Sequence, residues 1–512
     1  MNEALPDVPE VRVVGLPQLT SGFDLVERLD LPMHLKVHGP LDPLGGEQLA
    51  QLAEAINLKG RGGAGFPFHK KLRSVAESAI KRGVRPVVVV NGSEDEPACR
   101  KDTVLINRAP HLILDGALLC AEALGARTLV IGVTRESTQR SMEAALAERG
   151  LSNSRRSALR AWVQRNPVRM VTGAAASLIR SVDGGPAIPP GRKISASQSG
   201  VGGAPTLLSN AETFAQLAIA ARIGPERYGN TGLYDEPGTV MLTVSGAVAR
   251  PMVLEVPTGV PLRYVLQLAG APPVPQGVLD AVGGALGAGA ILPITQETCP
   301  LGESLRVAQW LAEESAGQCG PCYLGLPAAA RGMEDILNGG GPAALEALKQ
   351  VAKNVKRRGA CSHPDGSAMF LESTIKAFTD DLAAHVLGNG CGRPVEGVLP
   401  LFEGGRAPAG IPGGGEPEET GSSRQKIYVD WTLCRGHGLC ADILPEVFEL
   451  GADGFPTVAQ AQVPRYAEAK ALRAVRRCPA LALRIEEDTR GQAPARNLPV
   501  LSQGRGRRAL GR

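Results

Sequence analysis

The chain has 512 residues, more than three times the ~150 residues of a typical domain, so several domains are expected. Hydrophobic residues make up 43% and charged residues 21%, a balance that excludes wholesale disorder and a bundle of membrane-spanning helices. The net charge is only +4 and aromatic residues make up 4%, so neither the charge nor the supply of stacking rings favours a nucleic-acid partner.

The cellular compartment follows from two features of the sequence. No run of 18 apolar residues is present, and the opening MNEALPDVPE carries acids where a secretion signal needs a basic start. We therefore expect a cytoplasmic protein without an integral membrane segment. Cytosolic thiols stay reduced, so the ten cysteines are expected to be metal ligands or buried thiols.

Strand and helix patterns alternate after an N-terminal arm, residues 1–40, that shows no sustained period. Apolar runs predict strands at residues 86–91, 128–134 and 168–173. Amphipathic patterns predict helices within residues 44–60, 69–80, 110–126 and 138–150. This alternation is typical of an α/β domain with a largely parallel sheet, which we place at residues 41–235.

The pattern changes after residue 235. Short β-branched runs predict a small β-rich domain at residues 236–295, and residues 296–387 are predicted to be helical. The helical domain has three amphipathic segments, at residues 301–315, 342–357 and 369–386. The remaining predicted parts are a linker with 11 glycines and 5 prolines at residues 388–424, a small domain at 425–488 and a basic disordered tail at 489–512.

A glycine cluster occupies residues 60–65 (GRGGAG). It matches the G-x-G-x-x-G dinucleotide fingerprint by letters, but a helical pattern precedes it where that fingerprint requires a strand. Its four glycines leave backbone amides uncovered at the start of the next helix, and Arg61, Lys70 and Lys71 are nearby. This combination favours a phosphate-bearing cofactor. A tight turn that serves packing alone is the alternative.

A polar and acidic loop, residues 91–97 (NGSEDEP), directly follows the first predicted strand. Ligands of α/β sheets bind outside the carboxyl ends of strands, so this loop is well placed to contact a cofactor ring or sugar. A solvated acidic loop is the alternative.

Two groups of cysteines have the spacing of metal ligands. Cys319 and Cys322 form a C-x-x-C pair, and Cys361 follows a helical stretch that could return to it. Three thiols are one short of the usual four, and zinc or a redox dithiol are competing interpretations.

The second group consists of Cys434, His437, Cys440 and Cys478, the last followed by proline. It has the C-x2-C-x2-C…C-P arrangement of iron-sulfur proteins with His437 at the central position. With its flanking sequence it resembles small single-cluster ferredoxins of the actinobacterial type. The expected centre is 3Fe-4S, or 4Fe-4S if His437 binds iron, and a structural zinc site is the alternative.

Taken in order, five motifs give residues 45–387 a broad resemblance to one family. These motifs are GRGGAGFP, NGSEDEPACRKDT, PHLILDG, PTLLSNAETF and ESAGQCGPC. The chain resembles the NuoF family, the flavin-bearing subunit of respiratory complex I, which is related to RnfC proteins. The resemblance implies an FMN-binding α/β domain, a β-grasp domain of the SLBB type and a helical bundle with an iron-sulfur cluster, followed here by an α+β ferredoxin domain.

The resemblance also implies which residues bind cofactors. Those carried over to FMN are Gly60, Arg61, Gly62, Gly63, Gly65, Lys71, Asn91, Glu94, Glu96 and Asn210, of which Glu94 is also assigned a catalytic role. Those carried over to iron are Cys319, Cys322 and Cys361 in the helical domain, and Cys434, His437, Cys440 and Cys478 in the ferredoxin domain.

The sequence departs from the family at the first cysteine of the helical domain, where Ala316 stands. An alanine cannot bind iron, so the centre is expected to be 3Fe-4S, or 4Fe-4S with another ligand. Ser315 and Cys299 are the two substitutes that we considered. Absence of the cluster is the remaining alternative.

A second departure concerns the nicotinamide nucleotide. The family's two glutamates next to that nucleotide align with Ala174 and Ala175, Ser93 replaces an aspartate, and Ser74 stands where the family stacks an aromatic ring on adenine. Each lost base stack could cost ~1–3 kcal/mol of binding, by analogy with nucleic-acid bases. These changes weaken the expected NAD(P)H site and leave the FMN residues mostly intact.

The main functional expectation is an NADH dehydrogenase-like oxidoreductase of the NAD(P)H:ferredoxin or quinone type. Electrons would pass from NAD(P)H through FMN and the clusters to the tethered ferredoxin, and then to an external acceptor protein. A haem monooxygenase or another redox enzyme is the acceptor suggested by the ferredoxin resemblance, and other dehydrogenase subunits are further candidate partners. The alternatives are a nicotinamide-independent electron-transfer subunit and a cofactor-poor assembly subunit.

Overall fold

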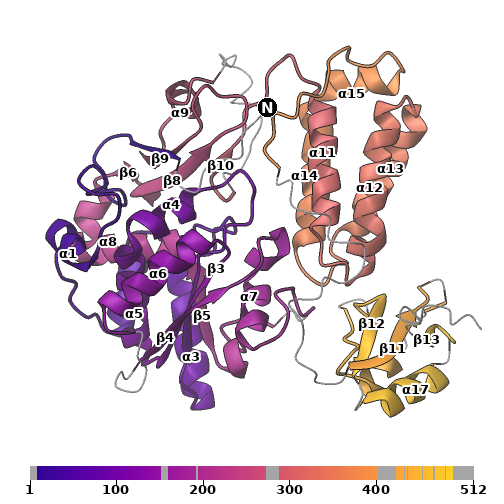
Figure 1. The fold of residues 1–512 in the computed structure, drawn as a ribbon, viewed down its shortest axis with the longest axis horizontal. Coiled ribbons are helices and arrows are strands. Elements are labelled where there is room, and N and C mark those ends of the chain that lie inside the picture. The colour runs from indigo at the N-terminus through magenta and orange to yellow at the C-terminus, as the bar shows by residue number, and fades with distance from the viewer. Residues whose placement is uncertain are drawn as a thin grey trace, which may run out of the picture. The chain divides into compact units, whose positions relative to one another are not determined.

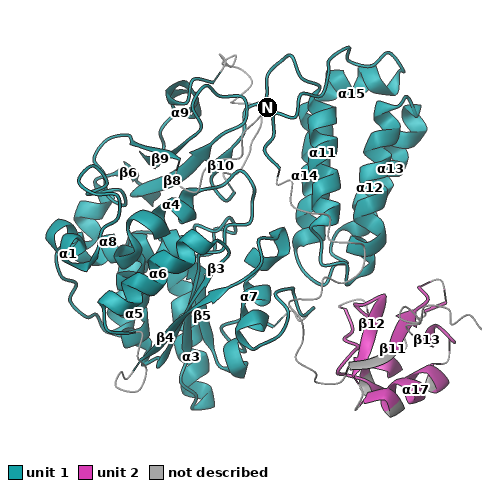
Figure 2. Ribbon diagram, viewed as in Figure 1, with its two compact units in different colours: residues 1–416 teal, residues 417–512 magenta. Residues whose placement is uncertain are grey.

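The structure is a computed structural model that describes residues 9–151, 159–191, 194–271, 287–401 and 422–487. Within the last range, residues 432, 435, 437, 452, 453, 465, 466 and 479 are not described. The chain divides into two compact units, residues 1–416 and residues 417–512 (Figure 2). Each unit is built around a hydrophobic core of its own.

A four-stranded parallel sheet forms the centre of the first domain (Figure 1). Its strands lie in the order β4 (Arg160–Arg165), β3 (Thr128–Val133), β2 (Val87–Asn91) and β5 (Thr206–Asn210). The apolar runs of β2 and β3 are almost wholly buried, as expected for a parallel sheet with helices on both faces. The predicted α/β architecture of this domain is therefore confirmed.

Helices cover the two faces of this sheet unequally. On one face Leu178 of α7 (Ala175–Val182) packs against Val89 and Val130. Every other helix of the domain contributes to the main core on the opposite face. These are α2 (Gly46–Ala55), α3 (Phe68–Arg82), α4 (Lys101–Arg108), α5 (Pro110–Leu124), α6 (Glu136–Glu148) and α8 (Ala211–Gly229).

The third predicted strand, at residues 168–173, is wrong. This segment contains a short 3-10 helix, η1 (Met170–Gly173), in which the Thr172 hydroxyl donates to the carbonyl oxygens of Pro167 and Arg169. A hydroxyl that bonds the local backbone competes with strand pairing. The two edge positions of the sheet are filled instead by β4 and β5, which were not predicted as strands from the sequence.

The prediction of an N-terminal arm is also wrong, because residues 10–38 contain regular structure. Strand β1 (Glu10–Val13) pairs in parallel with β9 (Met252–Pro257), and α1 (Leu31–His38) packs against α5. The second sheet has the order β1, β9, β8 (Thr239–Val244) and β10 (Ala290–Ile291), with α9 (Leu262–Leu268) packed on it. The N-terminal segment thus completes the predicted β-rich domain.

A buried carboxylate joins the N-terminal segment to this sheet. Glu255 of β9 is 0% exposed, and its two oxygens accept hydrogen bonds from the backbone amides of Gln18, Leu19 and Thr20 at 2.8–3.0 Å. The hydroxyls of Thr20 and Thr239 donate to the same carboxylate. Five donors compensate the desolvation of one buried charge.

The helical domain contains four long helices and a shorter one. They are α11 (Pro300–Glu313), α12 (Leu326–Leu337), α13 (Gly341–Val355), α14 (His363–Ala377) and α15 (Thr379–Val386). Two of the three predicted segments correspond to α11 and α13. The third is divided at Phe378 into α14 and α15, and α12 was not predicted.

The described residues of the second unit form a three-stranded antiparallel sheet and include two α-helices. Its strand order is β12 (Gln460–Pro464), β11 (Ser422–Val429) and β13 (Leu483–Glu487). The helices are α16 (Leu439–Ile443) and α17 (Glu468–Arg477). This agrees with the expected α+β ferredoxin fold. The predicted basic tail lies outside the described residues, as does most of the predicted linker.

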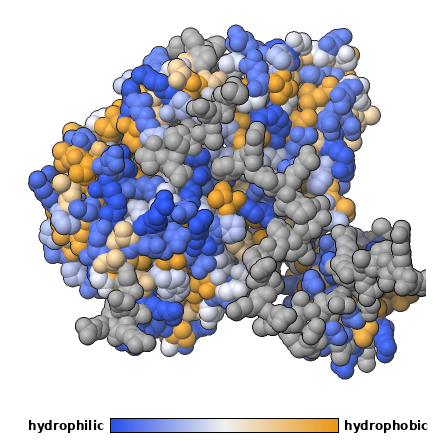
Figure 3. Space-filling model, viewed as in Figure 1, coloured by the Kyte–Doolittle hydropathy of each residue, from blue (hydrophilic) through white to orange (hydrophobic). Residues whose placement is uncertain are grey.

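Within the described ranges, no single helix is long and apolar enough to cross a membrane. Helices α4 and α5 pass such a test only as a pair, and they are bent by 92° relative to each other. Both contribute to the main core of the α/β domain. On the face drawn in Figure 3, hydrophobic residues among the coloured atoms are interspersed with hydrophilic ones.

Replacing the buried carboxylate by Glu255→Ala should destabilise the first unit by about 3 kcal/mol, because five donors lose their acceptor. Calorimetry would show a lower melting temperature, and proteolysis should begin within residues 14–25. Glu10→Ala is the matched control, since that exposed glutamate only pairs with Arg12. Equal melting temperatures for the two variants would contradict this role of Glu255.

Candidate functional site

Two asparagines lie side by side at the carboxyl ends of β2 and β5. Asn91 and Asn210 are partners in the parallel register of these strands. The side chain of Asn210 caps α8 by accepting from the amide of Glu212 at 3.0 Å, and its Nδ2 donates to Asp102 at 2.8 Å. Nδ2 of Asn91 donates to the carbonyl oxygen of Gly173 at 2.8 Å. The two predicted FMN ligands therefore meet at the sheet edge where α/β proteins bind ligands.

The glycine cluster forms a loop beside these asparagines. Two hydrogen bonds close the loop. The amide of Gly60 donates to the carbonyl oxygen of Phe66 at 2.9 Å, and the amide of Phe68 donates to the carbonyl oxygen of Leu58 at 2.8 Å. A Cβ atom built on Gly62 would lie 3.4 Å from Cβ of Asn210. The loop thus reaches the end of β5, which the sequence alone did not predict.

The backbone of this loop fits a bound anion. Gly63 and Gly65 have φ angles of 95° and 60°, which side chains disfavour. The amides of residues 62–65 have no acceptor among the described residues, and these residues are exposed. Nε of Arg61 and Oγ of Ser93 are buried without a partner in the described part of the chain. Free backbone amides in an exposed glycine loop suit a phosphate-bearing cofactor such as FMN.

Lys71 lies on α3 and reaches β5. Its Nζ donates to the carbonyl oxygen of Leu208 at 2.8 Å. Burial lowers the pKa of this ammonium group. Lys71 is therefore a partly desolvated cation that contacts β5 two residues before its last residue, Asn210.

The acidic loop is buried, so its interpretation as a solvated loop is wrong. Glu94 and Asp95 are 2% and 3% exposed. The carboxylate of Glu94 accepts from the amides of Asp102 and Thr103 at 3.0 and 3.1 Å and from the Thr103 hydroxyl at 2.6 Å. Glu94 thus caps the N-terminus of α4 and holds this helix against the site. This contact gives the predicted catalytic residue a positioning role.

The other two acids of the loop have perturbed pKa values. Burial, with the nearby charge of Glu96, raises the pKa of Asp95, which accepts a hydrogen bond from Thr172 at 3.2 Å. Burial and the charge of Glu94 raise the pKa of Glu96. Carboxyl groups that ionise reluctantly next to a strand end are typical of functional sites.

A buried ion-pair network under the site was not predicted from the sequence. Nζ of Lys101 lies 3.1 Å from the Asp102 carboxylate and 2.9 Å from that of Glu212, and all three side chains are nearly inaccessible. Burial raises the pKa of Asp102 to about 6. Burial by itself lowers the pKa of Lys101, but the attraction of the two carboxylates raises it overall. These residues lie in the motifs NGSEDEPACRKDT and PTLLSNAETF, but nothing in the sequence shows that Lys101 pairs with Glu212.

The expected nicotinamide region has small side chains. Ala174 is the N-cap of α7 and Ala175 is its first residue, so neither position offers a carboxylate. Oγ of Ser74 donates to Oγ of Ser197 at 2.9 Å. The position that aligns with the stacking aromatic is therefore engaged in a hydrogen bond.

Cys319, Cys322 and Cys361 converge at one end of the helical domain. Cys319 and Cys322 lie at the turn before α12 and share a small core with Ala360, while Cys361 precedes α14. A hydrogen bond with Cys322 lowers the pKa of Cys319 to about 6 and raises that of Cys322. The charge of Cys361 also raises the pKa of Cys322. Three converging sulfurs suit an iron-sulfur cluster.

The two substitutes for the missing fourth cysteine differ in position. Ser315 is hydrogen-bonded to Cys322, so a hydroxyl lies at this site. Cys299 caps the opposite end of α11, and a helix of 14 residues is about 20 Å long. The hypothesis that Cys299 completes this cluster is therefore wrong.

In the second unit, three predicted ligands lie close together. The same small core is in contact with Cys434, Cys440 and Cys478. Burial raises the pKa of Cys440, and the charges of Cys434 and Cys478 raise it further. His437 lies outside the described residues. The three sulfurs are the donor set of a cluster with at least three thiolate ligands.

A short segment connects the strand-end site to the cysteine loop of the helical domain. The amide of Met170 donates to the Glu314 carboxylate at 2.9 Å, and Nη2 of Arg169 donates to the Ser315 carbonyl oxygen at 3.1 Å. The same segment ends at Gly173, which is bound to Asn91. Both sites are therefore fixed to η1.

Models of four protein families match successive parts of the chain. Residues 53–219 match the Nuo51 FMN-binding domain and residues 241–284 the SLBB domain. Residues 303–385 match the NADH-ubiquinone oxidoreductase-F iron-sulfur binding region, and residues 427–485 match a 4Fe-4S single cluster domain. These matches confirm the predicted fold class in each part of the chain.

Two curated relatives, both F-type subunits of NADH-quinone oxidoreductases, agree with this assignment. The one from Rhizobium meliloti (strain 1021) is 28% identical over 75% of this chain and 97% of the relative. The one from Aquifex aeolicus (strain VF5) is 26% identical over 65% of this chain and 85% of the relative.

Solved structures of an NAD+-reducing NiFe hydrogenase are similar as well. The air-oxidized state is 26% identical with a TM-score of 0.62, covering 74% of this chain and 68% of that chain. The H2-reduced state has a TM-score of 0.64 at 24% identity, which supports the shared fold.

A side chain at Gly62 should interfere with cofactor binding, because its Cβ would point at Asn210 at the strand end. We expect Gly62→Val to lower the flavin content of the purified protein at least tenfold. Gly83→Val is the control, since that glycine ends α3 in open space and its replacement strains the backbone alone. Flavin absorbance per chain is the measurement, and normal flavin in Gly62→Val would contradict the site.

Proposed function

Because the chain belongs to the NuoF-like family and ends in a single-cluster ferredoxin domain, we propose that it passes electrons from NAD(P)H through FMN and iron-sulfur clusters to that ferredoxin. The chain is an electron-transfer flavoprotein of the NADH dehydrogenase type. The observation that carries the proposal is the glycine loop with free amides at the ends of β2 and β5, joined through η1 to three converging cysteines.

The α/β domain would hold FMN with three groups of residues. The amides of residues 62–65 would bind the phosphate with Asn210 beside them, and Asn91 would contact the ring and ribityl chain. Glu94 and Lys101 would support these residues without contacting FMN. Glu94 fixes the N-terminus of α4, and Lys101 fixes the N-terminus of α8 through Glu212. When bound, FMN accepts a pair of electrons as hydride and returns them singly.

The cysteines would hold iron-sulfur clusters, which supply one-electron acceptors for the flavin's electrons. Three sulfurs in each cysteine site fit a 3Fe-4S centre, and a fourth ligand from Ser315 or His437 would permit 4Fe-4S. The Gly/Pro-rich composition between the two units favours a tether that keeps the ferredoxin domain at high local concentration.

The partners of this chain are proposed by analogy with its relatives. By name, each curated relative is a single subunit of a larger NADH-quinone oxidoreductase, which favours other dehydrogenase subunits as partners here. The final acceptor would be a separate redox protein, such as a haem monooxygenase, that takes electrons from the ferredoxin domain.

A second candidate function is electron transfer between proteins without a nicotinamide nucleotide. It is favoured by the absence of carboxylates at Ala174 and Ala175 and by the hydrogen bond that engages Ser74. In this case the flavin would be reduced by a protein donor.

An anaerobic titration with NADH and then NADPH separates the two candidates. The main proposal predicts bleaching of flavin absorbance by one of them, followed by a change in the cluster EPR signal. The second candidate predicts that the flavin stays oxidised with both nucleotides and bleaches with dithionite. A purified, iron-replete protein without flavin would contradict both.

Restoring the family's cysteine at Ala316 should convert the helical-domain cluster. In a Cys440→Ser background, which removes one ferredoxin ligand, we expect Ala316→Cys to add one iron per chain and to replace a 3Fe-4S EPR signal by a 4Fe-4S signal. Ala347→Cys adds an exposed cysteine on α13 and should change neither. Unchanged iron in Ala316→Cys would contradict a three-thiolate cluster here.

A further inference from the structure

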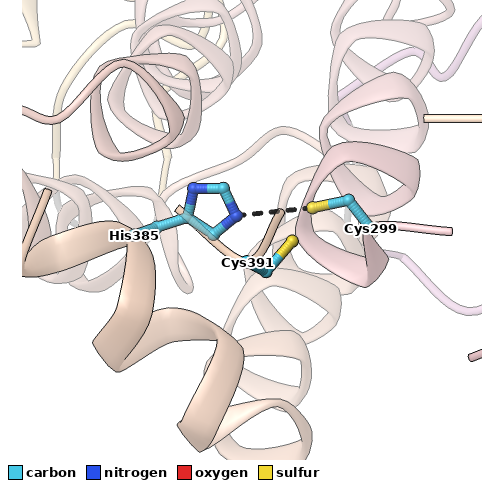
Figure 4. A group of neighbouring side chains, drawn as sticks. All are labelled: Cys299, His385 and Cys391. Atoms are coloured by element: carbon cyan, nitrogen blue, oxygen red, sulfur yellow. Dashed lines mark hydrogen bonds between the residues drawn. The ribbon is translucent and has the colours of Figure 1, made fainter. Parts of the chain in front are cut away.

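A second group of sulfur and nitrogen ligands lies away from both cysteine sites described above. Cys299, His385 and Cys391 place one ligand atom each within 4.8 Å of one another (Figure 4). In Figure 4 the imidazole of His385 and the two sulfurs point toward one another from separate segments of the chain. No iron-sulfur or flavin role of the protein uses these residues.

The segments that carry the three ligands are fixed to each other. Cys299 is the N-cap of α11, His385 lies in the last turn of α15, and Cys391 follows α15. The amide of Cys299 donates to the carbonyl oxygen of Pro394 at 2.7 Å, and the amide of Glu396 donates to the Thr298 hydroxyl at 3.1 Å. The backbone thus holds Cys391 beside Cys299 before any ion binds.

The buried carboxylate of Glu303 strengthens this arrangement. It is 1% exposed and accepts from the amides of Gly397 and Val398 at 2.7 and 3.2 Å. The segment after Cys391, which the sequence assigned to a flexible linker, is therefore attached to the first turn of α11 as far as residue 399. A site at Cys391 rests on this ordered segment.

The distances match tetrahedral zinc coordination. Zinc lies about 2.3 Å from thiolate sulfur and about 2.0 Å from imidazole nitrogen, so a tetrahedral ion separates the two atoms by about 3.5 Å. Sγ of Cys299 and Nε2 of His385 are 3.5 Å apart. The third sulfur lies within the 4.8 Å limit that contains all three atoms.

The surroundings also favour an ion over ordinary packing. Cys299 and His385 are 2% and 8% exposed, and Cys391 is half-buried. Two thiolates cancel the charge of one divalent cation, so the complex is neutral in a buried place. Cys299 accepts from the amide of Gly302 at 3.3 Å, and a thiolate is a better acceptor at a helix N-terminus than a thiol.

We propose that Cys299, His385 and Cys391 bind one structural zinc ion that fastens the end of the helical domain to its first helix. Two thiol protons leave when the ion binds, and a water or another small donor fills the fourth position. Sulfur and imidazole ligands select zinc over magnesium or calcium. The inference is independent of the proposed electron-transfer function.

The test is the metal content of the full-length protein, purified anaerobically with iron supplied and dialysed with one added equivalent of zinc. We expect about one zinc per chain by mass spectrometry, with a zinc X-ray absorption spectrum that contains two sulfur neighbours and one imidazole. His385→Gln and Cys391→Ser should each lower bound zinc at least fivefold while flavin and iron stay constant. Cys120→Ser, which removes a buried cysteine of α5, should keep the zinc.

Three outcomes would overturn the proposal. One is less than a tenth of an equivalent of zinc in the native protein. Another is zinc that persists in both variants, which would place it on the iron-sulfur cysteines. The last is a loss of iron in place of zinc from the variants. If Cys391→Ser fails to fold, it loses flavin as well as zinc. The zinc content of the milder His385→Gln variant then tests the proposal.

Discussion

The segment from Arg169 to Gly173 joins the two redox sites of the first unit. At one end Gly173 accepts a hydrogen bond from Asn91 at the strand ends. At the other, Arg169 and Met170 bind the backbone of Ser315 and the carboxylate of Glu314, just before the cysteine loop. Since electron transfer depends on fixed positions of donor and acceptor, this connection would hold the proposed flavin site and the proposed cluster site at a fixed separation.

Buried charges hold the other side of the flavin site. Lys101 pairs with Asp102 and Glu212, and Glu94 caps α4. Removing one member of such a group leaves an uncompensated buried charge, which is strongly destabilising. The charges therefore fix the ends of two helices beside the strand ends where the cofactor's polar groups are expected.

Local patterns predicted the parts of the fold that depend on local sequence. The apolar runs of β2 and β3 were recognisable because a strand that is buried on both faces is apolar throughout. The amphipathic faces of α3 and α13 were recognisable because burial on one helix face has a regular period. Strand β1 was missed because its partner β9 lies some 240 residues away, and pairing at that distance leaves no local pattern. The strand predicted at 168–173 failed because the Thr172 hydroxyl bonds the nearby carbonyl oxygens of Pro167 and Arg169.

The candidate site shows the same division. The glycine loop, the asparagines and the six clustered cysteines were found from motifs, because cofactor chemistry requires certain residues at short spacings. The capping role of Glu94 and the ion pair of Lys101 with Glu212 depend on tertiary contacts. The group of Cys299, His385 and Cys391 was missed because 85 residues separate the first two and no motif joins them.

The most direct test of this account is the rate of electron transfer from flavin to the helical-domain cluster after anaerobic mixing with a reductant. Glu314→Ala removes the acceptor for Met170, and a small displacement between the two sites should slow cluster reduction by about tenfold or more at unchanged flavin content. Glu313→Ala alters an exposed neighbour and should leave the rate unchanged. Equal rates in the two variants would contradict the claim that η1 couples the sites.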